Sequence, residues 1–126
     1  SEPIVVIGRS SEDLRLGQLL EEKVVTFNWP KVTLKEFCER LTELVDARIA
    51  VDEKVLQDEG VKVDFQFDAR AKNLSLSVAL RECLDNLANA KLTVVAEDGI
   101  LKVTSLEKAS TGREQILYNL GSLGIT

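Results

Sequence analysis

The sequence contains no histidine, and this absence restricts its chemistry more than any other feature. Histidine is the commonest general base in enzymes and the commonest side-chain ligand of metals. A Ser-His-Asp or Cys-His arrangement therefore cannot form within this chain. We expect a protein that is not an enzyme and that binds no metal.

Long hydrophobic runs are also missing. The longest are Ile4-Val5-Val6-Ile7 and Leu92-Thr93-Val94-Val95-Ala96, whereas a membrane-spanning helix needs about 20 apolar residues. We therefore expect no membrane span. The chain starts with Ser1 and shows no charged start followed by an apolar stretch and a cleavage site, so we expect a processed or excised fragment.

Phosphate-binding motifs are absent as well, because none of the seven glycines has GxGxxG or GxxxxGK[ST] spacing. Free amides at Gly8-Arg9-Ser10-Ser11 offer an anion site as the alternative to an ordinary capped helix start. Three carboxylate pairs lack the alternating spacing of a calcium loop and are interpreted as solvated turn charges; they are Asp52/Glu53, Asp58/Glu59 and Glu97/Asp98. We expect no cofactor.

Cysteine is scarce, since only Cys38 and Cys83 are present. Two such distant residues form neither a CxxC metal clip nor a disulfide-rich scaffold. Each falls on the apolar face of an expected helix, where a small core residue is the simpler interpretation. A Cys38–Cys83 disulfide is the alternative if the two helices touch.

The composition that remains is that of one globular domain. The 126 residues are 44% hydrophobic and 29% charged, which is sufficient for a single core. The net charge is −5, from 21 acidic and 16 basic residues interleaved along the chain. Because neutralising phosphates drives nucleic-acid binding, such proteins normally carry a basic face. We expect no nucleic-acid partner.

Residues 1–23 predict an N-terminal extension made of a strand and a helix. The β-branched residues 4–7 favour a short strand. Ser10 or Ser11 offers an N-cap for a helix over residues 11–22. Its expected core residues are Leu14, Leu19 and Leu20.

The next part of the chain predicts strand, helix and strand. Alternation gives a strand over 24–29, which Trp29-Pro30 should end because proline cannot donate a ladder hydrogen bond. Thr33-Leu34-Lys35-Glu36 has capping-box spacing and starts a helix that runs to about Asp46. Beyond it we expect a strand at 48–52, a helical turn at 53–59 closed by Gly60, and a strictly alternating strand over 61–69.

The second half repeats this pattern. Ser75 caps a second amphipathic helix, and the strands 92–96 and 100–104 flank a short Gly-containing turn typical of a β-hairpin. Five pairs of similar positions lie 42 residues apart: Thr33/Ser75, Leu34/Leu76, Cys38/Leu80, Leu41/Cys83 and Val45/Leu87. Two copies are too few for a solenoid. We therefore predict one α+β domain made of two β-α-β halves, followed by a linker and C-terminal strand in residues 105–126.

The order of these elements resembles the short N-terminal domain shared by bacterial secretins and TonB-dependent receptors. The resemblance covers residues 24–104 and lies in the stretches Val25-Thr26-Phe27, Val32-Thr33-Leu34, 47–52, 73–80 and 92–103. The longer stretch between Asp52 and Asn73 departs from the shortest members. The family implies a β-α-β-β-α-β-β module in which two helices pack on small sheets.

The resemblance implies a periplasmic protein-interaction domain of a secretin-like envelope protein. The implied partners are other envelope proteins, further domains of the same chain or a second copy. The alternatives are the signalling domain of a TonB-dependent receptor, which contacts an inner-membrane regulator, and a small ligand-binding or partner-completed enzyme domain. We predict partner contacts at an open sheet edge near 100–103 and along the C-terminal strand, whose residues otherwise fold back on this domain's own core. The candidate residues are Trp29, Ile100, Lys102, Ile116, Tyr118 and Leu120.

Overall fold

The computed structural model describes residues 4–7, 10–85, 87, 91–109, 116–119 and 124–125. Within these residues thirteen elements follow one another: β1 (Ile4–Ile7), α1 (Ser11–Glu22), β2 (Val24–Thr33), α2 (Leu34–Val45), β3 (Ile49–Val51), α3 (Glu53–Asp58), β4 (Gln66–Ser75), α4 (Leu76–Asp85), β5 (Leu92–Glu97), β6 (Ile100–Ser105), α5 (Leu106–Ala109), β7 (Ile116–Asn119) and β8 (Gly124–Ile125).

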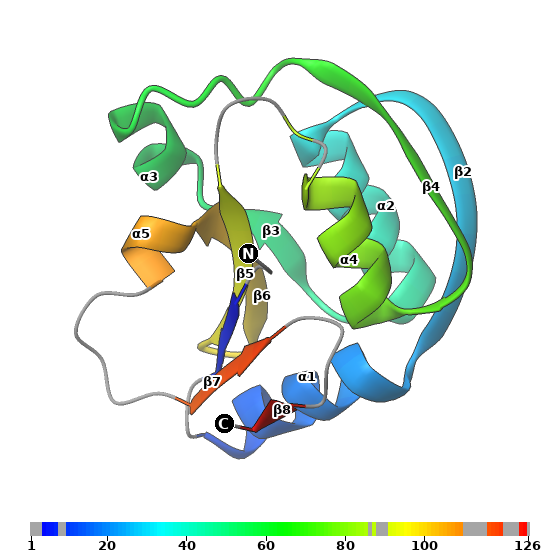
Figure 1. The fold of residues 1–126 in the computed structure, drawn as a ribbon, viewed down its shortest axis with the longest axis vertical. Helices are drawn as coiled ribbons and strands as arrows, with labels where there is room; N and C mark the ends of the chain where they lie inside the picture. Colours follow the sequence, from blue (N-terminus) through cyan, green and yellow to red (C-terminus); the bar gives the residue numbers. More distant parts are fainter. Residues whose placement is uncertain are drawn as a thin grey trace.

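The elements form layers, with α2 and α4 lying between a two-stranded ribbon and a larger sheet (Figure 1). The ribbon pairs β2 with β4, and the larger sheet has the order β3-β6-β5-β1-β7-β8. Both helices bury apolar faces in the one main core, which includes Leu34, Leu41, Leu76 and Leu80, none of them measurably exposed. The predicted α+β class and the β-α-β-β-α-β-β order are confirmed, with α3 added between β3 and β4.

The helices α2 and α4 begin at the predicted caps. The Glu36 amide donates to Thr33 Oγ1 at 3.2 Å, and the Thr33 amide donates to Glu36 Oε1 at 2.9 Å, so the capping box is complete. The Val78 amide donates to Ser75 Oγ at 3.3 Å. Each cap satisfies an amide that the first helical turn leaves unpaired. Each helix can therefore start directly after its strand without an intervening loop.

The β2–β4 ribbon has an internal twofold pattern. Val24 pairs with Ser75 at one end and Thr33 pairs with Gln66 at the other. Val24 and Gln66 are equivalent positions 42 residues apart, as are Thr33 and Ser75, so exchanging equivalent positions converts the first pair into the second. The Asn28–Arg70 pair converts into itself and marks the centre.

Both irregularities of the ribbon obey the same relation. In β2 the strand bulges at Lys31, whose amide donates to Asp68 Oδ1 at 3.0 Å. In β4 the bulge lies at Asn73, whose amide donates to Thr26 Oγ1 at 3.0 Å. Lys31 and Asn73 have φ angles of 53° and 52°. The sequence repeat is therefore also a repeat of backbone geometry.

Two strand boundaries differ from the prediction. The strand expected to end at Trp29-Pro30 continues to Thr33, because the bulge absorbs Pro30 without breaking the ladder. The strand expected over 61–69 begins only at Gln66, because β2, its ladder partner, gives way to α2 after Thr33.

Two further expectations need correction. Leu14 was expected in the core but is 42% exposed, and Leu16, at 3%, takes its place on the buried face of α1. The first residues of the expected linker form the short helix α5. The division at residues 23 and 104 stays a prediction, although the larger sheet takes strands from all three parts of the chain.

The N-terminal helix is tied to the predicted hairpin. Ser10 caps α1 by accepting from the Asp13 amide at 3.0 Å. The Asp13 side chain is buried and accepts from the Gly99 amide, in the β5–β6 turn, at 2.9 Å. Asp98 and Gly99 both have positive φ, as a two-residue hairpin turn requires. This contact fixes where α1 lies, and α1 forms one wall of the site below.

Candidate protein-binding surfaces

Trp29 lies in an aromatic cluster of the ribbon and α2. Its ring stacks on Phe27 with centroids 4.2 Å apart and meets the edge of Phe37 at 6.2 Å. The Arg40 guanidinium lies 5.9 Å from the centroid of the Trp29 ring. The half-buried Trp29 is therefore held by its own domain on both sides.

Ile100 and Lys102 share one face of β6, but the open edge predicted there is wrong. β6 is an inner strand, with Leu101 paired to Ile49 of β3 and to Ala96 of β5. Lys102 Nζ lies 3.8 Å from Glu97 Oε1, beside a small cavity of about 100 Å³ that Asp52 and Thr104 also line. A partner strand cannot add to β6 while β3 occupies its side.

The C-terminal candidates fall on β7 or just beyond it. β7 pairs antiparallel with β1, with Ile116 opposite Ile7 and Tyr118 opposite Val5. The backbone of the segment thus joins this domain's own sheet. The side chains of Ile116 and Tyr118, and the whole of Leu120, lie outside the described residues.

Both cysteines are buried and free. Burial raises the pKa of the Cys38 thiol to about 12 and that of Cys83 to about 11. Because the thiolate is the reactive form, both thiols are inert at neutral pH. The simpler of the two sequence interpretations, small core residues, is the one observed.

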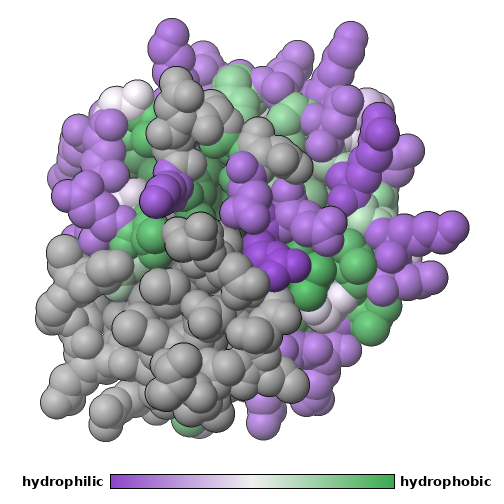
Figure 2. Space-filling view, in the orientation of Figure 1, coloured by the Kyte–Doolittle hydropathy of each residue, from purple (hydrophilic) through white to green (hydrophobic). Residues whose placement is uncertain are grey.

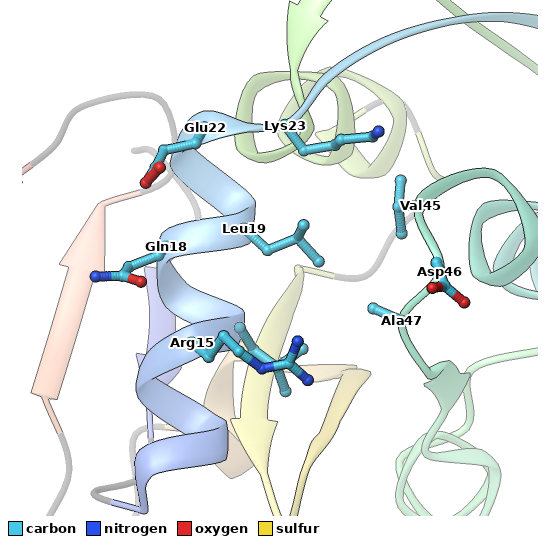
Figure 3. Close-up of a pocket in the computed structure, with 9 residues that line it drawn as sticks. Arg15, Gln18, Leu19, Glu22, Lys23, Val45, Asp46 and Ala47 are labelled. Atoms are coloured by element: carbon cyan, nitrogen blue, oxygen red, sulfur yellow. The ribbon is translucent and has the colours of Figure 1, made fainter.

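A groove of about 460 Å³ lies between α1 and the C-terminal end of α2. We call it the α1–α2 groove; its lining is Arg15, Leu16, Gln18, Leu19, Glu22, Lys23, Val45, Asp46 and Ala47. Leu19 points from α1 toward Val45, and Ala47 lies beside it (Figure 3). Figure 2 shows hydrophobic surface among hydrophilic side chains in the region where the ends of α1, α2 and α4 meet.

The charged side chains of the groove are unevenly placed. Arg15 and Lys23 reach into the gap from α1 and the residue after it, whereas Gln18 and Glu22 turn to the other side of the helix (Figure 3). Arg15 also pairs with Glu12 at 3.8 Å, but both side chains are mostly exposed, so this pair is weak and exchangeable. The groove therefore combines an apolar floor with two cations on the α1 side and the carboxylate of Asp46 on the α2 side.

Sequence reasoning did not predict this groove. Leu19 was expected in the core, and it does pack against the core from a half-buried position. The available signal was the leucine content of α1, which includes Leu14, Leu16, Leu19 and Leu20. That is more than a single buried stripe needs. The partner wall at Val45 and Ala47 depends on tertiary packing that helix periodicity does not specify.

Comparison with known protein families, with curated proteins and with solved structures finds no match to the chain. Within the part of the chain that the structure describes, no three metal-ligating side chains gather into a cluster. No helix among those residues has the length and hydrophobicity to cross a membrane.

Proposed function

We propose that this chain is a non-catalytic protein-interaction domain of a secretin-like envelope protein, working in the periplasm. The observation that carries the proposal is Leu19, a half-buried apolar side chain on the floor of an open groove between two helices. The fold supports it, because residues 24–105 follow the element order that the secretin resemblance implies.

The chemistry of the groove defines the partner segment. Leu19, Val45 and Ala47 suit an apolar side chain. Arg15 and Lys23 on the α1 side suit carboxylates on either side of it, provided that these carboxylates face α1 and not Asp46 on the α2 side. The expected ligand is therefore a protein segment with one apolar anchor between acidic residues. Binding such a segment needs no catalytic group.

The test is photo-crosslinking in intact bacteria that produce the full-length protein. A diazirine analogue of lysine replaces Lys23 in the groove or, as a matched control, the exposed Lys35 at the opposite end of α2. We expect one defined envelope protein to be captured at position 23 and none at position 35. Arg15→Glu should abolish the capture, because it replaces a groove cation with an anion.

Equal capture at both positions, or capture that Arg15→Glu leaves unchanged, would refute the groove as the binding surface. A captured partner outside the envelope would refute the cellular role. Capture of an inner-membrane regulator would instead support the receptor signalling domain.

A further inference from the structure

The α1 wall of the α1–α2 groove carries a regular row of side chains. Arg15, Leu19 and Lys23 are four positions apart, so each lies about 6 Å beyond the one before along the helix axis. The row has the order cation, apolar side chain, cation. Figure 3 shows Arg15 and Lys23 reaching into the gap on either side of Leu19.

The α2 wall has the opposite charge. Asp46 caps the C-terminal end of α2 and lines the groove there. The last carbonyl groups of a helix give its C-terminus a partial negative charge, and the last turn of α2 contains no basic residue to offset it. Val45 and Ala47, the sequence neighbours of Asp46, continue the apolar floor. A ligand in the groove therefore meets cations at one wall and negative charge at the other.

The backbone at both walls is already hydrogen-bonded within the domain. The Lys23 amide donates to the Leu19 carbonyl at 2.9 Å, and the Lys23 carbonyl accepts from the Leu76 amide at 2.7 Å. At the other wall the Asp46 amide donates to the Thr42 carbonyl at 3.0 Å. The lining residues thus offer an extended peptide no ladder to join, and its own amides would lack backbone partners. A helical segment satisfies its backbone groups internally.

We propose that the α1–α2 groove binds an amphipathic helix whose two edges carry opposite charges. Its acidic edge faces α1, with carboxylates about two turns apart that reach Arg15 and Lys23. Its apolar stripe lies on the floor at Leu19 and Val45, and its basic edge faces Asp46 and the end of α2. The choice of surface rests on the proposed function, and the ligand's secondary structure and charge pattern go beyond it.

The two walls together select this ligand over a uniformly charged helix. A purely acidic helix would suit Arg15 and Lys23 but would place carboxylates against Asp46, where like charges repel. A purely basic helix would suit Asp46 and meet the same conflict at the α1 wall. A helix with one edge of each sign satisfies both walls while its apolar stripe covers the floor.

The test measures binding of synthetic helices to the whole chain by fluorescence anisotropy at low ionic strength. The probe is a labelled alanine-based peptide of about 18 residues, with leucines along one stripe, glutamates along one edge and lysines along the other. We expect saturable binding. One control peptide has the same composition with glutamates and lysines mixed on both edges, and another has two interior prolines that break the helix. Both should bind about tenfold more weakly.

Double-mutant cycles then assign each edge to its wall. Asp46→Asn removes the charge of the α2 wall and keeps a residue that tolerates the φ of 55° found there. It should weaken binding of the probe about threefold, as expected for an exposed ion pair, and should not affect a peptide whose lysines are replaced by glutamine. Arg15→Gln should behave in the same way toward a peptide whose glutamates are replaced by glutamine. Asp58→Asn, at an exposed position of α3 outside the groove, should bind like the wild type.

Circular dichroism of all variants checks that they fold. A probe that does not bind at concentrations up to about 1 mM would overturn the proposal. So would a probe that binds no better than either control peptide, or a cycle without coupling at Asp46 or at Arg15. Capture of an envelope protein at position 23 together with such a result would keep the proposed function and reject the helical ligand. Binding with both couplings, without capture at position 23, would do the reverse.

Discussion

The half of the chain containing β2 and α2 and the half containing β4 and α4 share a backbone plan but fill it differently. Their strands pair about a common centre, and their helices start one residue after equivalent caps. The first half places aromatic rings at three positions, Phe27, Trp29 and Phe37. The second half has alanine at each equivalent position, Ala69, Ala71 and Ala79.

The size difference is complementary across the ribbon. Phe27 pairs with Ala71, and Trp29 pairs with Ala69. Two equal halves with rings at every site would overfill the layer between ribbon and helices, and two with alanine would leave cavities. The comparison teaches that the halves are equivalent in backbone and have diverged in volume so that one fits the other.

The largest effect should come from breaking this complementarity. Phe27→Ala removes a ring that is 7% exposed and stacks on Trp29, and should lower the free energy of unfolding by about 3–5 kcal/mol. Ala71→Phe alone should overpack, at a cost of about 1–3 kcal/mol. The double variant conserves volume across the pair. Its loss of unfolding free energy, measured by urea unfolding, should be smaller than the sum of the losses of the two single variants. Strict additivity would show that the two positions do not share packing space.

The caps give a smaller contrast. Thr33→Ala and Ser75→Ala each remove the acceptor for an orphan amide and should cost about 1 kcal/mol. We expect the two losses to be similar, because the second arm of the box is the Glu36 carboxylate accepting from the Thr33 backbone amide, which alanine keeps. Only the first half should therefore lose further stability when position 36 is changed to alanine, since the equivalent position in the second half is Val78. Thermal unfolding of Thr33→Ala, Ser75→Ala and Glu36→Ala measures these losses. A Glu36→Ala variant as stable as the wild type would mean that the Glu36 arm of the box contributes nothing.

The same box predicts a pH dependence confined to the first half. The hydrogen bond from the Thr33 backbone, and then the one with its side chain, lowers the pKa of the Glu36 carboxyl below its usual value of 4.5. A carboxyl whose pKa is lower in the folded state adds stability above the unfolded pKa and loses it as pH falls through the folded one. We expect Glu36→Gln to flatten the decline of stability below about pH 4.5. A matched Glu43→Gln on the exposed side of α2 should leave that decline unchanged.

Sequence periodicity predicted the elements of both halves because their signals are local. The capping box at Thr33, the hairpin turn at Gly99 and the apolar faces of the two helices each lie within a few neighbouring residues. The 42-residue repeat even predicted that the halves are alike. It could not predict that equivalent strands pair with each other, because ladder partners depend on contacts far apart in sequence.

The Leu14 and α5 errors are local, but the other missed features are tertiary. Pro30 was expected to end its strand, but Asp68, on the opposite strand, stabilises a bulge there. β6 was expected at an edge, but β3 returns to its side. The α1–α2 groove needs α1 placed by the Asp13–Gly99 contact, which joins residues 86 positions apart in the sequence. None of these partners can be recognised from a local window.

The smallest predicted contrast concerns the two bulge residues with positive φ, Lys31 and Asn73. A lysine in this conformation carries a steric cost of about 1–2 kcal/mol that glycine lacks, whereas asparagine tolerates it. Glycine adds an entropic cost of about 0.5–1 kcal/mol. Lys31→Gly should therefore raise the free energy of unfolding by a few tenths of a kcal/mol, roughly the difference between these costs. Asn73→Gly should lower it slightly, because it also removes the 3.3 Å contact of Asn73 Oδ1 with Thr26 Oγ1. Calorimetric melts of the two variants decide the matter: equal shifts would mean that the bulges are equivalent in energy as well as in geometry.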